Sequence, residues 1–281
     1  MKISLADKYM LTHQSDASFL LIISYLGAII VLKGVTTMKE TIYTIPINDA
    51  LDKECFCPLC EMYKGLEESE VRYAVGPAMM EPDFRELTNK KGFCKKHMAD
   101  LSAESKALAL ALVFDTHLAE LEKIMEADLS AKKGIFGKGD NGFEKLAGSL
   151  KEVKESCVIC ERIESTFARY IDNFVYLLKK DGDFINKVLK TEGFCMEHFS
   201  MLLSVAAKEM SAKEFEKCFA PVVEHQKKRV EQYRRYIKNF ADSFDYRNKG
   251  KEMDAPKDTL IKTSFLLTAE FEPKDKKLKN I

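Results

Sequence analysis

Apolar side chains recur every three to four positions along most of the chain, and this period predicts amphipathic helices. In the first half the expected helices cover residues 61–75 and 82–91, followed by one that starts at Cys94, breaks near 102–105 and continues to about 127. In the short helix we expect Asp83 as the N-cap residue, with Phe84 and Leu87 facing inward.

The second half repeats this order of helices. The pattern predicts helices from Cys160 to a break at Asp181-Gly182, from Asp183, after His198, and over 212–244. Two segments lack a helical period. Residues 41–46 are expected to be extended because Pro46 limits them, and residues 260–271 fit either a short strand or a helix.

Five regions follow from these patterns. Glycines among lysines mark a flexible connector between two similar helical lobes. The expected regions are a hydrophobic leader or mis-assigned start (1–37), a first lobe (38–128), the connector (129–149), a second lobe (150–248) and a poorly structured tail (249–281). The predicted fold class is therefore all-α, with two pseudo-repeated lobes.

The leader contains an apolar run over residues 17–32, slightly shorter than the ~20 residues that span a membrane. Charged residues precede the run and no small-x-small cleavage site follows it, so a signal peptide fits poorly. Met38 begins a sequence typical of a soluble protein. We therefore favour a mis-assigned start over a membrane anchor. The protein would associate with a membrane only if residues 17–32 were such an anchor.

Composition narrows the class of protein. The chain has 281 residues, 44 basic and 44 acidic side chains and no Trp. This balance gives no global field that would recruit nucleic acid or an anionic membrane. Eight cysteines are too few for a disulfide-rich secreted scaffold, and their association with histidines indicates metal binding in a reducing compartment, the cytoplasm.

One motif pair occurs twice. In each half a Cys-x-x-Cys element is followed by a Gly-Phe-Cys-x-x-His element, and 33 or 34 residues separate the last cysteine of the first element from the cysteine of the second. The glycine suits a left-handed residue at a helix end, and a cysteine and a histidine three residues apart share the face of a helical turn. The candidate metal ligands are Cys57, Cys60, Cys94, His97, Cys157, Cys160, Cys195 and His198.

Three thiolates and one imidazole per half match a tetrahedral Cys3His zinc site, with two zinc ions per chain. We expect each half to close its own site, so that the metal joins the two ends of a helical hairpin. Four protein ligands leave no open position, which favours structural sites over an enzyme. The sequence thus predicts a zinc-binding module that binds or scaffolds an unidentified protein partner.

Two other functions remain open. The Cys-x-x-Cys pairs could serve a thiol-disulfide redox enzyme or sensor, and iron could replace zinc. Nucleic acid could bind the basic helix over 225–238, although a solvated helix face explains it better. Cys55 is interpreted as a free cysteine and Cys218 as a core residue.

Other polar residues have less specific interpretations. His117 and His225 occupy similar places in the two long helices and fit core or interface histidines better than ligands or bases. Residues 76–86 have no counterpart in the second half. If the protein has an activity, this asymmetric stretch is the place where we expect it.

Between Met38 and about Asn248 the sequence resembles an uncharacterised bacterial family, the domain-of-unknown-function family numbered 6062. The similarity is carried by five segments: Tyr43 to Ala50, Cys57-Pro58-Leu59-Cys60, Gly76 to Glu81, Thr88 to Cys94 and Phe244 to Asn248. The resemblance implies a bacterial, anaerobe-associated protein with paired Cys-x-x-Cys and Cys-x-x-His elements. It supplies no activity, and it implies a start near Met38.

Overall fold

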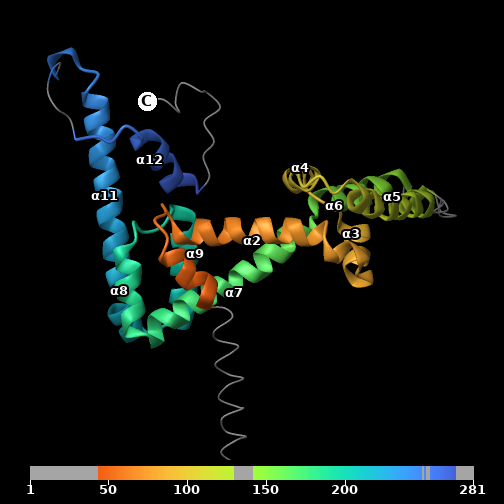
Figure 1. The fold of residues 1–281 in the computed structure, drawn as a ribbon, viewed down its shortest axis with the longest axis horizontal. Helices are drawn as coiled ribbons and strands as arrows, with labels where there is room; N and C mark the ends of the chain where they lie inside the picture. Colours follow the sequence, from red (N-terminus) through yellow and green to blue (C-terminus); the bar gives the residue numbers. More distant parts are fainter. Residues whose placement is uncertain (1–43, 130–141, 249, 251–253, 270–281) are drawn as a thin grey trace, which may run out of the picture.

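Figure 1 shows the chain in a computed structural model that describes residues 44–129, 142–248, 250 and 254–269. Helices and turns make up this part of the chain, and it contains no strand. The expected all-α class is confirmed.

The first half contains the predicted helices in the predicted order, together with two that were not predicted, over residues 44–51 and in α6. Residues 44–51 form one helix, and then come α2 (Pro58–Ala74), the 3-10 turn η1 (Pro77–Met80), α3 (Pro82–Lys91), α4 (Lys95–Ala103), α5 (Ala107–Leu129) and α6 (Gly142–Glu155). Proline occupies the first turn of α2 and α3, where its missing N–H costs no helical hydrogen bond.

The described part of the second half also consists of helices and turns. They are α7 (Val158–Lys180), α8 (Gly182–Lys190), α9 (Met196–Glu209), α10 (Ala212–Glu214), the π-helical turn η2 (Phe215–Phe219), α11 (Ala220–Asp242), the 3-10 turn η3 (Tyr246–Asn248) and α12 (Thr259–Thr268). The segment predicted as one helix over 212–244 is therefore interrupted by a π-helical turn, and Pro221 lies in the first turn of α11.

The centre of the molecule is an antiparallel pair formed by α2 and α7 (Figure 1). The Tyr63 and Phe167 rings pack edge to face with centroids 5.2 Å apart. Further along the pair, Arg162 Nε donates to Glu70 Oε2 at 2.6 Å. Since higher numbers on α2 face lower numbers on α7, the first turn of each helix lies beside the last turns of the other.

Each end of this pair has its own group of helices. Helices α3, α4, α5 and α6 lie at the end where α7 begins, whereas α8, α9, α11 and α12 lie at the end where α2 begins (Figure 1). Both hydrophobic cores combine the two halves of the sequence. The larger core joins residues 47–62 to residues 167–222, and the smaller joins residues 71–109 to residues 157–163.

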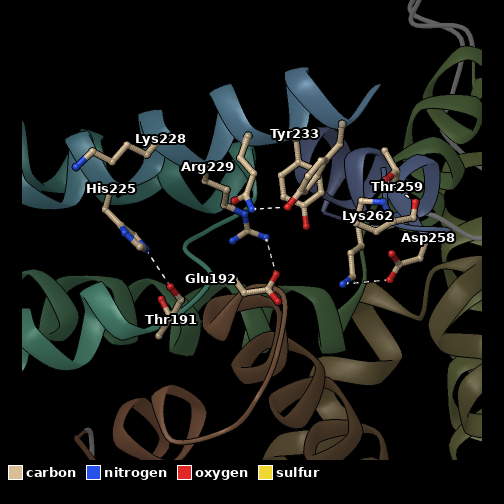
Figure 2. A pocket seen from close by; sticks show the side chains of 12 residues that line it. Thr191, Glu192, His225, Lys228, Arg229, Tyr233, Asp258, Thr259 and Lys262 are labelled. Carbon is tan, nitrogen blue, oxygen red and sulfur yellow. Dashed lines mark hydrogen bonds and ion pairs between the residues drawn. The ribbon is translucent and has the colours of Figure 1, made fainter. Parts of the chain in front are cut away.

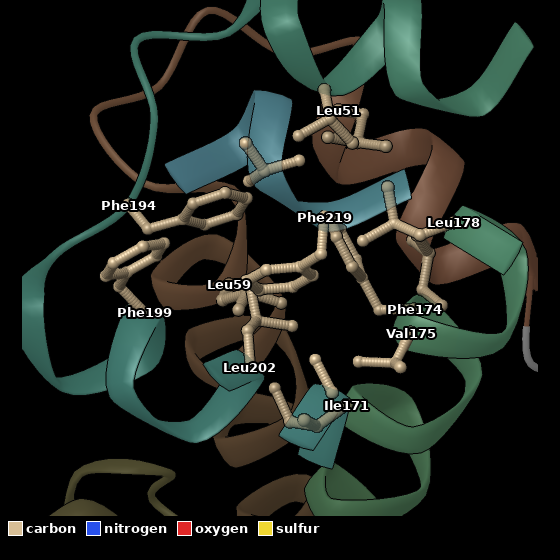
Figure 3. Packing of buried hydrophobic residues seen from close by; sticks show 14 of the residues in the cluster. Leu51, Leu59, Ile171, Phe174, Val175, Leu178, Phe194, Phe199, Leu202 and Phe219 are labelled. Atoms are coloured by element: carbon tan, nitrogen blue, oxygen red, sulfur yellow. The ribbon is translucent and has the colours of Figure 1, made fainter. Parts of the chain in front are cut away.

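Aromatic rings fill the centre of the larger core (Figure 3). Phe174 on α7 is fully buried and packs edge to face against Phe184 on α8 and Phe194 in the turn before α9, with centroids 5.0 and 5.7 Å apart. Leu59 from α2 and Phe219 from η2 belong to the same core and are also fully buried. This core holds α2 against the helices of the second half.

Several local expectations were wrong. Residues 44–51 are helical, whereas Pro46 led us to expect an extended segment over residues 41–46. Glu81, not Asp83, occupies the N-cap position of α3, and its side chain makes no capping hydrogen bond. Leu87 is exposed, whereas Thr88 at the next position is buried. Within the expected connector, residues 142–149 belong to α6. The undecided segment near residue 260 is the helix α12.

Within the described ranges, no helix is both long and apolar enough to cross a membrane. The apolar run over residues 17–32, residues 130–141 of the connector and the last residues of the tail lie outside the described residues.

Replacing Phe174 by Ala should lower the free energy of unfolding by about 3–5 kcal/mol, because the change leaves a cavity beside the Phe184 and Phe194 rings. Phe244, which is 75 % exposed, provides the matched control. Its replacement by Ala should change stability by less than about 0.5 kcal/mol. Urea denaturation of the two variants measures both values, and equal losses would contradict the assigned core.

Candidate metal centre

The eight candidate ligands gather in two groups of four. One, the Cys57 cluster, contains Cys57, Cys60, Cys195 and His198; the other, the Cys94 cluster, contains Cys94, His97, Cys157 and Cys160. In each group the ligand atoms all lie within 4.8 Å of one another. Each Cys-x-x-Cys element therefore meets the Cys-x-x-His element of the other half. The expectation that each half closes its own site was wrong.

The crossed arrangement follows from the antiparallel pair. Each Cys-x-x-Cys element lies at the first turn of a long helix, α2 or α7. The Cys-x-x-His element of the same half follows that helix, so it lies at the far end of the helix. The other long helix begins at this far end, and its Cys-x-x-Cys element completes the cluster.

The Cys57 cluster has the dimensions of a tetrahedron. Cys195 Sγ lies 3.9 Å from Cys57 Sγ and 3.7 Å from Cys60 Sγ. His198 Nδ1 lies 3.7, 3.3 and 3.2 Å from the sulfurs of Cys57, Cys60 and Cys195. Zinc bonds of ordinary length give edges of about 3.8 Å between sulfurs and about 3.6 Å between sulfur and nitrogen. The residues fit a zinc ion.

The Cys94 cluster has the same form. Its Cys94 and Cys160 sulfurs are 3.8 Å apart. His97 Nδ1 lies 3.4 Å from Cys94 Sγ and 3.3 Å from the sulfurs of Cys157 and Cys160. Both histidines present Nδ1 to the sulfurs, so each Nε2 faces away from its cluster.

The turn before each Cys-x-x-His element depends on glycine. Gly92 has φ +67° and Gly193 has φ +102°, a conformation that other residues rarely adopt. Different groups hold the two turns. Gln226, buried on α11, accepts from Phe194 N at 2.9 Å and donates to Phe194 O at 2.7 Å. At the other turn, Val158 N donates to Gly92 O at 3.1 Å.

Each cluster favours one thiolate beside one imidazolium. Burial opposes ionisation of Cys57, but hydrogen bonds from Cys195, Cys60 and His198 outweigh it and hold the Cys57 pKa well below its ordinary value. Burial also opposes the charge on His198, yet Cys195 and Cys57 raise its pKa to about 9. In the metal-free protein, the Cys57 thiolate thus already has the negative charge that a bound cation would neutralise.

The Cys94 cluster behaves in the same way. Burial alone would raise the pKa of Cys157, but His97 and backbone groups lower it to about 6. Burial alone would lower the pKa of His97, but Cys157, Cys94 and Glu67 raise it to about 9. A metal ion that binds here replaces the imidazole proton.

The surroundings of the two clusters differ. Glu67 Oε1 lies 3.1 Å from His97 Nε2, so a carboxylate on α2 fixes the ring of one cluster. Together with Asp100 these two residues form a third group that could hold a cation. Around the other cluster, the Tyr63 and Phe167 rings lie 6.4 and 5.1 Å from the His198 ring.

A cavity of about 370 Å³ lies between α11, the start of α12 and the turn at Thr191-Glu192 that leads to Cys195 (Figure 2). Basic and acidic side chains both line it, and Lys262 pairs with Asp258 across 3.1 Å. Figure 2 shows Arg229 between Tyr233 and Glu192, with Glu192 Oε2 3.8 Å from its Nη2. Burial lowers the pKa of Arg229, while Tyr233, Glu192, Cys57 and Cys195 oppose that effect.

Both additional histidines have structural partners. His117 Nδ1 lies 2.9 Å from Asn89 O, and His225 Nε2 lies 2.9 Å from Thr191 O. Each histidine therefore holds the end of the helix that precedes a Gly-Phe-Cys turn. This contact agrees with the interpretation of both as core or interface residues.

The two remaining cysteines lie outside both clusters. Cys218 is buried in the larger core, as expected. Cys55 is half-buried, and burial raises its pKa to about 11. Neither belongs to a group of possible metal ligands in the described part of the chain.

The stretch over residues 76–86 has structural contacts. Tyr73 Oη donates to Glu81 Oε2 at 2.6 Å. Arg85 donates to Leu112 O and Thr116 Oγ1 at 2.9 and 3.0 Å, which ties α3 to α5.

The basic helix over residues 225–238 offers fewer charges to nucleic acid than its sequence indicates, because Arg229 within it is buried.

The described structure is thus that of a helical protein with two Cys3His-type clusters, each shared between the two halves of the chain. The chain belongs to DUF6062, a family of unknown function whose model matches residues 38–274. No curated protein and no solved structure matches the chain.

Replacing Gly193 by Ala should destabilise the protein by about 1–3 kcal/mol, because the residue has positive φ and its new Cβ would lie 2.8 Å from Gln226 Oε1. Gly65, in the middle of α2, is the control because a Cβ added there would have no atom within 4 Å. Its replacement by Ala should raise stability by about 0.5–1 kcal/mol. Thermal unfolding compares the variants, and a neutral Gly193→Ala would contradict the assigned turn.

Proposed function

We propose that this protein is a zinc-dependent helical scaffold in which two structural Cys3His sites fasten the two halves of the chain together. The crossed clusters carry the proposal. Each cluster joins the first turn of α2 or α7 to the first turn of α9 or α4, so a bound ion ties together helices that are distant in sequence. Such a site contributes its binding free energy to folding.

The donor set supports zinc as the metal. Three soft thiolates and one imidazole suit Zn²⁺, and the sulfur–sulfur and sulfur–nitrogen distances fit tetrahedral edges. Four protein ligands complete the coordination and leave no position for a substrate. The role we assign to the metal is therefore structural, and the scaffold holds a protein partner that is not yet identified.

Native mass spectrometry of the full chain, purified anaerobically without chelators, should show two zinc ions. Double variants then test the crossed ligand sets. Cys57→Ser with Cys195→Ser should remove one ion, because both residues belong to one cluster. Cys57→Ser with Cys94→Ser should remove both ions, because the two residues belong to different clusters.

The control for these variants is Cys55→Ser with Cys218→Ser, which should retain two ions because neither residue belongs to a cluster. Sites closed within each half would reverse the two results, with one ion lost from the Cys57 and Cys94 pair. A chain purified without zinc or any other metal would reject the proposal.

A redox role is the second candidate, and it is favoured by the lowered pKa of Cys57 and Cys157 in the two Cys-x-x-Cys pairs. In that role each pair would pass two electrons to glutathione disulfide, forming one protein disulfide and two glutathione thiols. The helices should then persist in both states. The scaffold instead predicts that oxidation expels zinc and lowers helicity, which circular dichroism in glutathione buffers measures.

A further inference from the structure

A buried cation beside the Cys57 cluster lacks the hydrogen bonds that such a group normally makes. The Arg229 side chain is 3 % exposed, and its three nitrogens have no hydrogen-bond partner among the described residues. An unpaired buried charge costs several kcal/mol, so a nearby negative charge is expected to compensate it. Glu192 is a weak candidate because it lies 3.8 Å away and is 54 % exposed.

The Cys57 cluster offers a stronger compensating charge. Arg229 Cζ lies 3.8 Å from the centre of the Phe56 ring, and Phe56 directly precedes Cys57. On the other side, its Nη1 would lie 3.2 Å from a Cβ on Gly193, two residues before Cys195. The guanidinium is thus held between the two segments that supply ligands. A zinc ion with three thiolates and a neutral imidazole has a net charge of minus one, which a cation here would offset.

The Cys94 cluster has a partner of the opposite charge. Glu67 is 16 % exposed and contacts His97 Nε2, so it adds negative charge to the histidine of that cluster. Lys96, which pairs with Glu67 at 2.5 Å, is half-exposed and therefore screened by solvent. Two of the cysteine residues there, Cys94 and Cys160, are also half-buried, whereas Cys60 is the one half-buried cysteine of the other cluster.

From these differences we propose that the two zinc sites are unequal: Arg229 makes the Cys57 cluster inert, and the Cys94 cluster is the site where thiol modification and zinc loss begin. The inference rests on the proposed zinc sites. A thiolate loses nucleophilicity when a cation neutralises it and gains access when it is exposed. The Cys94 cluster is therefore a modification site for soft electrophiles.

Iodoacetamide modifies a cysteine by a single nucleophilic substitution. A thiolate sulfur attacks the methylene carbon, a sulfur–carbon bond forms, the carbon–iodine bond breaks and iodide leaves. The product is a neutral thioether, which is a poor ligand for zinc, so the cluster releases its ion. No oxidant or reductant takes part.

The test treats the zinc-loaded full chain with iodoacetamide and follows it over time by native mass spectrometry and peptide mapping. Loss of the first zinc should accompany modification of Cys94, Cys157 and Cys160, while Cys57, Cys60 and Cys195 remain unmodified. Equal rates at the two clusters, or earlier modification at Cys57, would overturn the proposal. A zinc count of zero before the reagent is added would instead reject the proposed function.

Variants test the role of Arg229. Arg229→Met should speed zinc loss from the Cys57 cluster by about 10–100-fold and leave the Cys94 cluster unchanged. Arg229→Lys keeps the charge and should stay close to the original rate. Lys228→Met removes an exposed charge from the position directly before Arg229 and serves as the matched control. If the Met variant does not fold, Arg229→Gln replaces it, and an unchanged rate in the neutral variant would refute the role.

Discussion

The antiparallel pairing of α2 with α7 determines where the eight cysteine and histidine residues of the two clusters lie. Each helix begins with a Cys-x-x-Cys element, and the pairing sends the two elements to opposite ends of the molecule. Contacts along the pair, such as Tyr63 with Phe167 and Arg162 with Glu70, fix its register. The cores at both ends depend on this register because each combines residues from the two halves.

Crossing changes what a bound metal does for stability. Cys57 and Cys195 are 138 residues apart, and Cys94 and Cys160 are 66 apart. A cross-link that closes loops of this length stabilises the folded chain by about 4–5 kcal/mol in the chain-entropy model. The Cys57 cluster is incomplete until the chain has been synthesised past His198. Folding therefore requires long-range contacts, which form more slowly than local helical contacts.

The sequence predicted most helices and all eight clustered residues, because periodicity, glycine turns and ligand spacing are local signals. It did not predict the pairing of the motifs, although helix length contained a clue. The 23 residues of α7 extend roughly 35 Å. The 9 residues of α8 return only about 14 Å, and the four residues from Thr191 to Phe194 add about 13 Å. The returning chain is therefore too short to bring Cys195 back to the start of α7. Glu67 and Arg229 have no motif, so their roles beside the clusters emerge only from the tertiary structure.

The crossed arrangement also gives a physical reason for the duplicated motif. When two copies of the motif lie on an antiparallel helix pair, each can supply its cysteine pair to the other, and a cluster of the same type then forms at both ends of the pair.

The most direct measurement is a crystal structure of the purified protein with anomalous diffraction recorded at the zinc edge. Crossed zinc sites predict two peaks at opposite ends of the α2–α7 pair, one of them among Cys57, Cys60, Cys195 and His198. A peak bounded by Cys57, Cys60, Cys94 and His97, or no peak, would contradict it.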